Sequence, residues 1–352
     1  MEIKHSTASR VAAAGFRYLA DRGVEEKSRN GPVIVAPGPV TSIYTRPLQR
    51  VLFSPLRDAN PWFHLLGDAL WCLAGRHDIA WPVYFNSKYA AYSDDGTTQW
   101  GAYGRRWRSW FGYDQLQAVV KELQVNSGSR RAVLTMWSAN SYPALPDDLR
   151  RAYSGGVDVP CNTHIYFDVR DKQLNMTVCC RSNDALWGAY GANVVVFSML
   201  QEYIAAALKV VPGEYRQFSN NFHVYPANLP ALDDDEASPR ERLLALASDL
   251  EYNDYYTREG SPVRPFALVN TSIAQWNLDL DKFLSNPLRP QGDFEDTFFT
   301  SVAGPMYRAW RERKERKGDG LDWARLIGAE DWRRACIEWI LRRERRKKEE
   351  AK

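Results

Sequence analysis

The chain has 352 residues, of which 45% are hydrophobic and 25% charged, and its formal net charge is +3. This composition is typical of a soluble globular protein, and a charge so near neutrality does not favour nucleic acid as a direct partner. The sequence shows no uninterrupted apolar run of eighteen residues, so a membrane span is not expected. No signal peptide is expected either, because residues 1–20 mix charge throughout. The five cysteines lack Cys-x-x-Cys spacing, which predicts reduced thiols in a cytoplasmic protein and no metal site.

The first third of the chain predicts two helices around a region of turns. Residues 8–22 place apolar residues at helical spacing, and residues 28–48 combine Pro and Gly with β-branched residues, which indicates loop plus strand. The Asp58–Pro61 start signal introduces an apolar segment that stops at Gly75, as a buried helix does. Residues 84–107 are aromatic and polar without periodicity, which predicts a functional loop.

The remaining elements alternate strands and helices before a charged helical end. A tight turn at Arg170–Lys172 joins two alternating runs and predicts a hairpin. The predicted elements are, in order, a helix at 116–123, a buried strand at 131–137, strands at 162–169 and 173–180, an apolar helix at 192–208, a short strand at 220–225, and helices from about 238.

Cys161, which follows a proline, is the candidate nucleophile. A cysteine attacks only as thiolate and needs positive charge nearby, and taken alone a buried cysteine is more often inert packing. Arg181-Ser182 supplies a cation and a hydroxyl suited to a phosphate monoester. Arg130 and Arg131 supply two further guanidinium groups just before a predicted strand.

Polar residues around the apolar helix indicate a heterocyclic ligand. Asp184 and Asn193 flank its start, and buried Asp and Asn side chains need partners such as the edge of a planar base. His223 and Tyr225, two residues apart on a predicted strand, point the same way and suit sugar hydroxyls. The 13 tryptophans and 18 tyrosines fit either an aromatic core or a pocket for flat ligands, and composition does not separate the two.

These motifs, in this order and spacing, resemble the core of the thymidylate synthase family over roughly residues 28–230. The matching stretches are Trp71-x-Leu73-x-Gly75, Tyr103-Gly104-x-x-Trp107-Arg108, Ser129-Arg130-Arg131, Pro160-Cys161, Arg181-Ser182-x-Asp184, Gly188, Asn193 and Phe222-His223-Val224-Tyr225. The resemblance implies an α/β three-layer fold in which a large mixed sheet packs against helices and forms the dimer interface. We expect a catalytic domain over 1–305 and a basic helical extension over 306–352.

The resemblance also implies a role for each matched residue. Cys161 adds to C6 of a pyrimidine nucleotide monophosphate, Tyr103 assists proton removal at C5, and Asp68 handles a proton or water. The one-carbon donor is 5,10-methylenetetrahydrofolate. The implied ligand contacts are Arg181, Ser182 and Arg29 with the phosphate, Arg130 and Arg131 with the phosphate of the partner in an obligate homodimer, Asn193 with the base, His223 and Tyr225 with the sugar, and Asp184, Tyr89 and Trp71 with the folate.

Departures from the synthase pattern cluster around the transferred carbon. Asp68 replaces a glutamate, Asn162 replaces a histidine after the nucleophile, and the stretch before Asn193 is one residue longer. Tyrosines within 88–92 stand where synthases place tryptophans. A pocket that admits water would hydrate the exocyclic methylene instead of reducing it, so these departures favour the 5-hydroxymethylase branch found in phages with modified DNA. The alternative is a true thymidylate synthase.

The base and sugar are predicted from single positions. Asn193 favours uracil, hence dUMP, because cytosine-using relatives carry Asp there; dCMP or CMP is the alternative. Ser182 and the Arg130-Arg131 pair favour deoxyribose. A catalytically dead nucleotide-binding relative would not need Cys161, and a nucleic-acid binder acting through the basic tail fits poorly with the near-neutral charge.

Overall fold

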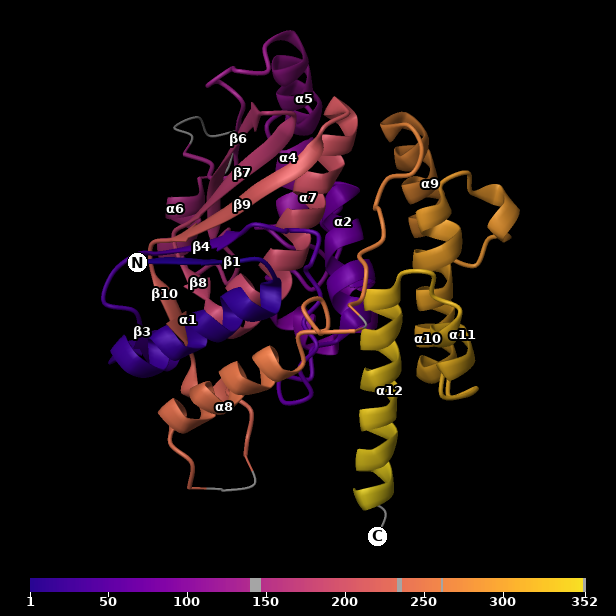
Figure 1. Ribbon diagram of the computed structural model, residues 1–352. Coiled ribbons are helices and arrows are strands. Elements are labelled where there is room, and N and C mark those ends of the chain that lie inside the picture. Colours follow the sequence, from indigo (N-terminus) through magenta and orange to yellow (C-terminus); the bar gives the residue numbers. More distant parts are fainter. Residues whose placement is uncertain (140–146, 233–235, 261, 351–352) are drawn as a thin grey trace.

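A six-stranded mixed sheet forms the centre of the protein (Figure 1). The computed structural model describes residues 1–139, 147–232, 236–260 and 262–350. The strand order is β1-β4-β9-β7-β6-β5, with β6, β7 and β5 antiparallel and β7 parallel to β9. The strands are β1 (Glu2–His5), β4 (Val40–Tyr44), β5 (Val133–Thr135), β6 (Asn162–Arg170), β7 (Gln173–Cys180) and β9 (Val211–Ser219).

A smaller sheet of four strands lies at one end of the large one and carries several candidate site residues. Its order is β2-β3-β10-β8. The strands are β2 (Val24–Ser28), β3 (Gly31–Val35), β8 (Asn183–Asp184) and β10 (Phe222–Val224). The parallel pairing of β8 with β10 sets Asp184 opposite His223. Two residues that are 39 positions apart in the sequence thus become neighbours.

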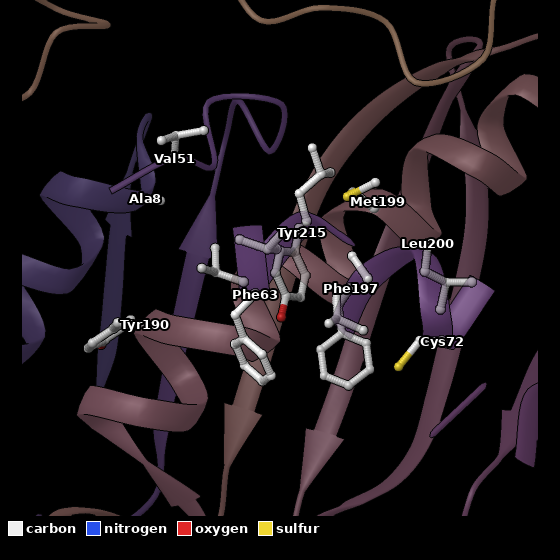
Figure 2. Packing of buried hydrophobic residues seen from close by; sticks show 14 of the residues in the cluster. Ala8, Val51, Phe63, Cys72, Tyr190, Phe197, Met199, Leu200 and Tyr215 are labelled. Carbon is white, nitrogen blue, oxygen red and sulfur yellow. The ribbon is translucent and has the colours of Figure 1, made fainter. Parts of the chain in front are cut away.

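The apolar helix α7 (Asn193–Leu208) packs along one face of the large sheet. Its first thirteen residues are all buried, as expected for a helix that is hydrophobic all round. Phe197 of this helix lies beside Tyr215 of β9 in the core (Figure 2), with ring centroids 6.5 Å apart. Within the described residues, Ala185–Leu208 is long and apolar enough to cross a bilayer, and 78% of its apolar window is buried inside the protein.

Two helices near the site contain π-helical turns. The predicted buried helix ending at Gly75 is present as a π-helix, η1 (Phe63–Ala69), followed by α2 (Leu70–Leu73). The stretch before α7 is a second π-helix, η3 (Ala185–Ala192), interrupted at Tyr190 and Gly191. A π-turn accommodates one residue more than an α-turn. The one additional residue before Asn193, relative to the synthase pattern, is therefore accommodated within η3, and α7 keeps regular α-helical geometry.

Most predicted elements are confirmed, and one is wrong. Helix α1 (Ala8–Arg22) has the predicted bounds because Thr7 caps its first turn. Residues 84–107, predicted as a loop, contain the end of α3 (Ala80–Phe85), the 3₁₀ helix η2 (Ser87–Tyr92) and most of α4 (Tyr103–Arg108). These helices are too short for periodicity to reveal them. Strands β1, β2 and β9 were not predicted; in β9, Pro212 and Gly213 obscure the alternation.

The C-terminal helices share their core with the rest of the chain. The Trp62 indole donates to the Met306 carbonyl at 2.7 Å and contacts the Trp339 ring at 5.4 Å between centroids. Cys336 and Ile340 are fully buried. The other helices are α5 (Gln115–Val125), α6 (Asp148–Tyr153), η4 (Pro226–Asn228), α8 (Pro239–Tyr252), α9 (Ile273–Ser285), η5 (Gln291–Asp293), η6 (Phe299–Ala303), α10 (Gly304–Lys314), α11 (Leu321–Arg325) and α12 (Glu330–Glu350).

Candidate active site

The hairpin of β6 and β7 brings Cys161 beside Arg181. Asn162, at the start of β6, pairs with Cys180, at the end of β7, so the residues just outside the ladder are also adjacent. The Arg181 backbone N–H donates to the Cys161 carbonyl at 2.9 Å, and its guanidinium Nη2 lies 3.9 Å from Cys161 Sγ. The same guanidinium donates to the carbonyls of Val159 and Pro160, both at 3.0 Å. The arginine is therefore held against the loop that carries the thiol.

Opposing charges act on the Cys161 thiol. Burial raises its pKa above the usual value, Arg181 and Arg29 lower it, and Asp158 and Asp184 raise it. Arg29 lies on the turn between β2 and β3, so this turn reaches the site. Burial is the largest of these effects on the pKa of the thiol. Two cations are placed to stabilise the thiolate when it forms.

Tyr103, at the first position of α4, lies next to the nucleophile. Its ring stacks on Phe197 with centroids 5.5 Å apart, and burial raises the pKa of its hydroxyl, followed by the effect of Cys161. The following turn of α4 is anchored by Arg106, which is fully buried and binds the Asp148 carboxylate through two nitrogens at 2.7 and 2.8 Å. This buried ion pair fixes the segment that presents Tyr103.

Asp68 lies on the π-helix η1 among apolar and aromatic side chains. Burial raises the pKa of its carboxyl to about 7, and the Cys72 thiol lies 3.6 Å from Oδ1. The charge of Asp68 also acts on the hydroxyl of Tyr89 in η2. Trp71, predicted to contact folate, lies inside the core with its indole donating to the Asp78 carbonyl. Its ring edge meets Tyr89, so it supports that tyrosine.

The polar residues around η3 form a connected cluster. Asn193 is buried, and its amide donates to Asn183 Oδ1 at 3.0 Å, while Asn183 donates to Ser219 Oγ at 3.0 Å. Asp184 caps η3 by accepting from the backbone N–H groups of Leu186 and Trp187, both at 2.7 Å. The Asn193 side chain is thus hydrogen-bonded to β8, the strand that directly follows Arg181 and Ser182.

Two of the remaining predicted residues join this group, and two lie elsewhere. His223 faces Asp184 in the register, accepts or donates a hydrogen bond with Asn221 at 2.8 Å, and meets the Tyr225 ring edge-on at 5.2 Å. Arg130 and Arg131 lie exposed before β5, and Arg131 binds Glu122 at 3.0 Å. The structure of one chain therefore does not bring this pair to Cys161.

A groove of about 970 Å³ opens beside Leu186 and Trp187, next to the Asp184 cap. Phe63 and His64 of η1 line it together with six cations and other residues. The cations are Arg57, Lys88, Arg342, Arg343, Arg345 and Arg346, four of them from α12. Three carboxylates, Asp58, Asp249 and Glu349, also line the groove, and Asp58 binds Arg342, Arg343 and Arg346 at 2.7 to 3.3 Å, so an excess of positive charge remains. An anionic ligand with a flat ring fits this surface.

Arg57 lines the groove and was not predicted from the sequence as a site residue. Its Nη2 donates to the Leu186 carbonyl at 2.6 Å, whereas Nε and Nη1 have no partner among the described residues. Burial lowers its pKa to about 10, and the negative charge of Asp184 opposes that effect. Unpaired buried N–H groups are costly, so Arg57 is placed to bind a ligand acceptor. A lone arginine before a helix start gave no signal.

Asp158 and Gln99 were also missed. The Asp158 carboxylate accepts from the Gly101 backbone N–H at 2.7 Å, and burial raises its pKa to about 6. A Cβ atom at Gly101 would lie 2.8 Å from Asp158 Oδ2, so the close approach requires glycine. The one available signal was a carboxylate three residues before Cys161.

Comparisons with known proteins agree with this geometry. The thymidylate synthase family model matches residues 60–254. A deoxyuridylate hydroxymethyltransferase of Pseudomonas phage M6 is 41% identical over 348 residues, which is 97% of this chain and 94% of the relative. Proteins of the same name from Bacillus phage SP01 and Delftia phage PhiW-14 are 34% and 31% identical over 53% and 64% of this chain, and 49% and 62% of their own lengths. The chain belongs to the thymidylate synthase family.

Proposed function

We propose that this protein hydroxymethylates C5 of dUMP, with 5,10-methylenetetrahydrofolate as the one-carbon donor and water as the source of the hydroxyl oxygen. The observation that carries the proposal is the arrangement of Cys161, Arg181 and Tyr103 at one end of the sheet, with Asp68 and Tyr103 both close enough to act on Tyr89. The phage relatives named deoxyuridylate hydroxymethyltransferase support the same activity. They also make the cytoplasm of an infected cell the expected location.

Each residue of the site has a different role in the proposed reaction. Cys161 Sγ adds to C6 of the nucleotide, which places negative charge on C5 and O4, and Arg181 holds the 5′-phosphate and the thiolate. The folate supplies a one-carbon unit at the oxidation level of formaldehyde. C5 would bond to this one-carbon unit, and Tyr103 then assists removal of the C5 proton while the carbon–nitrogen bond to tetrahydrofolate breaks, which leaves an exocyclic methylene on the base. Addition of water to this carbon and departure of Cys161 from C6 restore the aromatic pyrimidine.

Asp68 fits the hydration step. Burial raises the pKa of its carboxyl to about 7, so the ionised form increases as the pH rises through neutrality. The ionised form accepts one proton from the attacking water, as a general base does. An aspartate in place of the longer glutamate of the synthases leaves space for that water. The pH profile of hydroxymethylation is therefore expected to rise through about pH 7.

A substrate comparison tests the proposed function. The protein is incubated with 5,10-methylenetetrahydrofolate and, in parallel, dUMP, dCMP, UMP or CMP, and products are identified by mass spectrometry. The proposal expects 5-hydroxymethyl-dUMP with release of tetrahydrofolate. Preferred conversion of a cytosine nucleotide would correct the base, and a 5-methyl product with dihydrofolate would identify a thymidylate synthase instead.

We infer that the cationic groove holds the glutamate tail of the folate. Phe63 and Trp187 line the groove beside the Asp184 cap, and four of its cations come from α12. This assigns the basic C-terminal helix to cofactor binding, since successive carboxylates of a glutamate tail complement a row of arginines.

Arg345→Glu is expected to raise the KM for polyglutamylated methylenetetrahydrofolate about fivefold, because one favourable charge contact of about 1 kcal/mol becomes repulsive. The KM for the monoglutamate changes less. Lys347→Glu is the matched control, since it makes the same charge change on the same helix outside the groove. Equal effects of the two variants, or equal effects on the two cofactor forms, would contradict the assignment.

We further infer that the active form is a homodimer built on the open face of the large sheet. Val133 of β5 and Tyr166 of β6 pair across the strands and are 41% and 46% exposed, an unusual apolar pair for a solvated sheet face. Arg130 and Arg131 lie just before β5 in the sequence. In an isologous dimer each chain presents them to the other.

Mixing two inactive variants tests this arrangement. Arg130→Ala/Arg131→Ala and Cys161→Ala homodimers are each expected to be nearly inactive. Random exchange of subunits should restore about a quarter of the wild-type activity, because half of the dimers are mixed and each has one complete site. No restoration, in a sample where subunit exchange is demonstrated, would mean that the arginines serve their own chain.

A further inference from the structure

Asp158 and Gln99 connect the nucleophile loop to the tyrosine beside Asp68. Tyr89 in η2 donates its hydroxyl hydrogen to Gln99 Oε1. The Gln99 side chain in turn hydrogen-bonds to the Asp158 carboxyl group and so lowers the pKa of that group. Gly101 donates its backbone N–H to the same carboxylate at 2.7 Å. The chain of contacts therefore runs from Asp158 through Gln99 to Tyr89.

The direction of these hydrogen bonds is fixed by Asp158. An ionised carboxylate only accepts, so Gln99 must turn its NH₂ group towards Asp158 and its carbonyl oxygen towards Tyr89. Tyr89 then has to donate its one hydrogen to Gln99. The phenol oxygen is left as a hydrogen-bond acceptor on its remaining side.

Tyr89 packs against the helical segment that carries Asp68, because its ring meets Phe63 of η1 and Trp71 of α2. The carboxylates of Asp68 and Asp158 both act on the Tyr89 hydroxyl and raise its pKa, after the larger effect of burial. The Tyr89 ring is held from several directions, by Phe63, Trp71 and Tyr92. The ring contacts therefore hold the hydroxyl oxygen in one position, where the charges of both carboxylates act on it.

We propose that Asp158 is a positioning residue for the nucleophilic water, acting through Gln99 and Tyr89; this rests on the proposed hydroxymethylase activity. A water that donates one hydrogen to Tyr89 and the other to Asp68 directs a lone pair at the exocyclic methylene. In the hydration step the water oxygen bonds to that carbon, and the π electrons of the C5–methylene bond move onto C5 and O4. Asp68 takes one water proton, and expulsion of the Cys161 thiolate from C6 restores the C5–C6 double bond.

The substitution Asp158→Asn reverses this orientation without changing the size of the side chain. The amide introduced in this way would keep its oxygen on the Gly101 N–H and turn its NH₂ group to Gln99. Gln99 then flips, its NH₂ group faces Tyr89, and the phenol hydrogen points into the site. A water beside Tyr89 would then accept the phenol hydrogen on its lone pair, and that lone pair would no longer point at the exocyclic methylene.

Single-turnover kinetics with excess enzyme, 5,10-methylenetetrahydrofolate and [5-³H]dUMP separate the two halves of the reaction. In Asp158→Asn and in Tyr89→Phe, tritium release is expected within about threefold of wild type, while formation of 5-hydroxymethyl-dUMP slows about 10- to 100-fold. The double variant should be no slower than the slower single variant, because both changes break the same chain. Asp95→Asn is the control, since its exposed carboxylate caps the same loop at Thr97 and Thr98.

The outcomes are distinct. Tritium release and product formation that fall in parallel, no change in either, or additive effects in the double variant would each overturn the role of Asp158. If Asp158→Asn does not fold, Gln99→Met breaks the chain and leaves the loop before Cys161 intact, and the same expectations apply to it. If the wild-type protein forms a 5-methyl product, the proposed function itself is wrong. This result does not depend on the variants, so the two failures are distinguishable.

Discussion

Replacing Cys161 with alanine is expected to lower turnover of dUMP about 10⁴-fold or more and to abolish tritium release from C5. Both follow from one cause, because without addition at C6 no negative charge develops at C5 and its proton stays in place. The thiol is also the group to which the surrounding cations are directed, with Arg181 Nη2 3.9 Å from Sγ. Rates of tritium release and of product formation, measured on the same sample, check the prediction.

Cys179→Ala is the matched control for this experiment. Cys179 is a half-buried thiol on the neighbouring strand β7, on the other side of the sheet from the fully buried Cys180. It should keep near wild-type activity. Tritium release that persists in Cys161→Ala, in a variant whose thermal unfolding matches wild type, would show that another group attacks C6.

The second large effect is expected for Asn193→Asp, which should shift the ratio of kcat/KM for dCMP over dUMP roughly 10- to 100-fold towards dCMP. The Asn193 amide is able to donate to and accept from the uracil edge, whereas a carboxylate only accepts and suits the cytosine amino group. The side chain lies at the buried start of α7, next to Asn183. Steady-state kinetics with both nucleotides measure the ratio within one variant, so a partial loss of folded protein cancels.

Asn193→Asp carries its own structural cost. The present amide donates to Asn183 Oδ1 at 3.0 Å, and a carboxylate there faces an acceptor until the Asn183 amide turns over. Overall activity is therefore expected to fall even as preference shifts. A lower activity with an unchanged dCMP-to-dUMP ratio would mean that Asn193 does not read the base.

Much of the architecture around the nucleophile is predictable from local pattern. The Arg170–Lys172 turn, with positive φ at Asp171 and Lys172, joins two alternating strands into β6 and β7 as expected. This hairpin sets Cys161 beside Arg181, although they are 20 residues apart in the sequence. The family resemblance correctly indicated an α/β fold for the same reason, because the motifs lie at strand ends and helix starts.

Other parts of the site depend on contacts that local sequence does not encode. Asp158 and Gln99 lie in segments without periodicity, and the approach of the Asp158 carboxylate to this loop requires a glycine at position 101. The cationic groove needs α12 to lie against Asp58, a contact across 284 residues between Asp58 and Arg342. The tail RRERRKKEEAK alone looked like a solvated helix end. The π-turns likewise follow from packing, since no propensity predicts them.

The most direct test of the account is the origin of the product oxygen. The protein is incubated with dUMP and 5,10-methylenetetrahydrofolate in H₂¹⁸O, and the nucleotide and folate products are identified by mass spectrometry. The account predicts 5-hydroxymethyl-dUMP carrying ¹⁸O in its hydroxymethyl group, together with tetrahydrofolate. Unlabelled 5-methyl-dUMP formed together with dihydrofolate would contradict it, because the methylene would then have been reduced by hydride and no water would have been added.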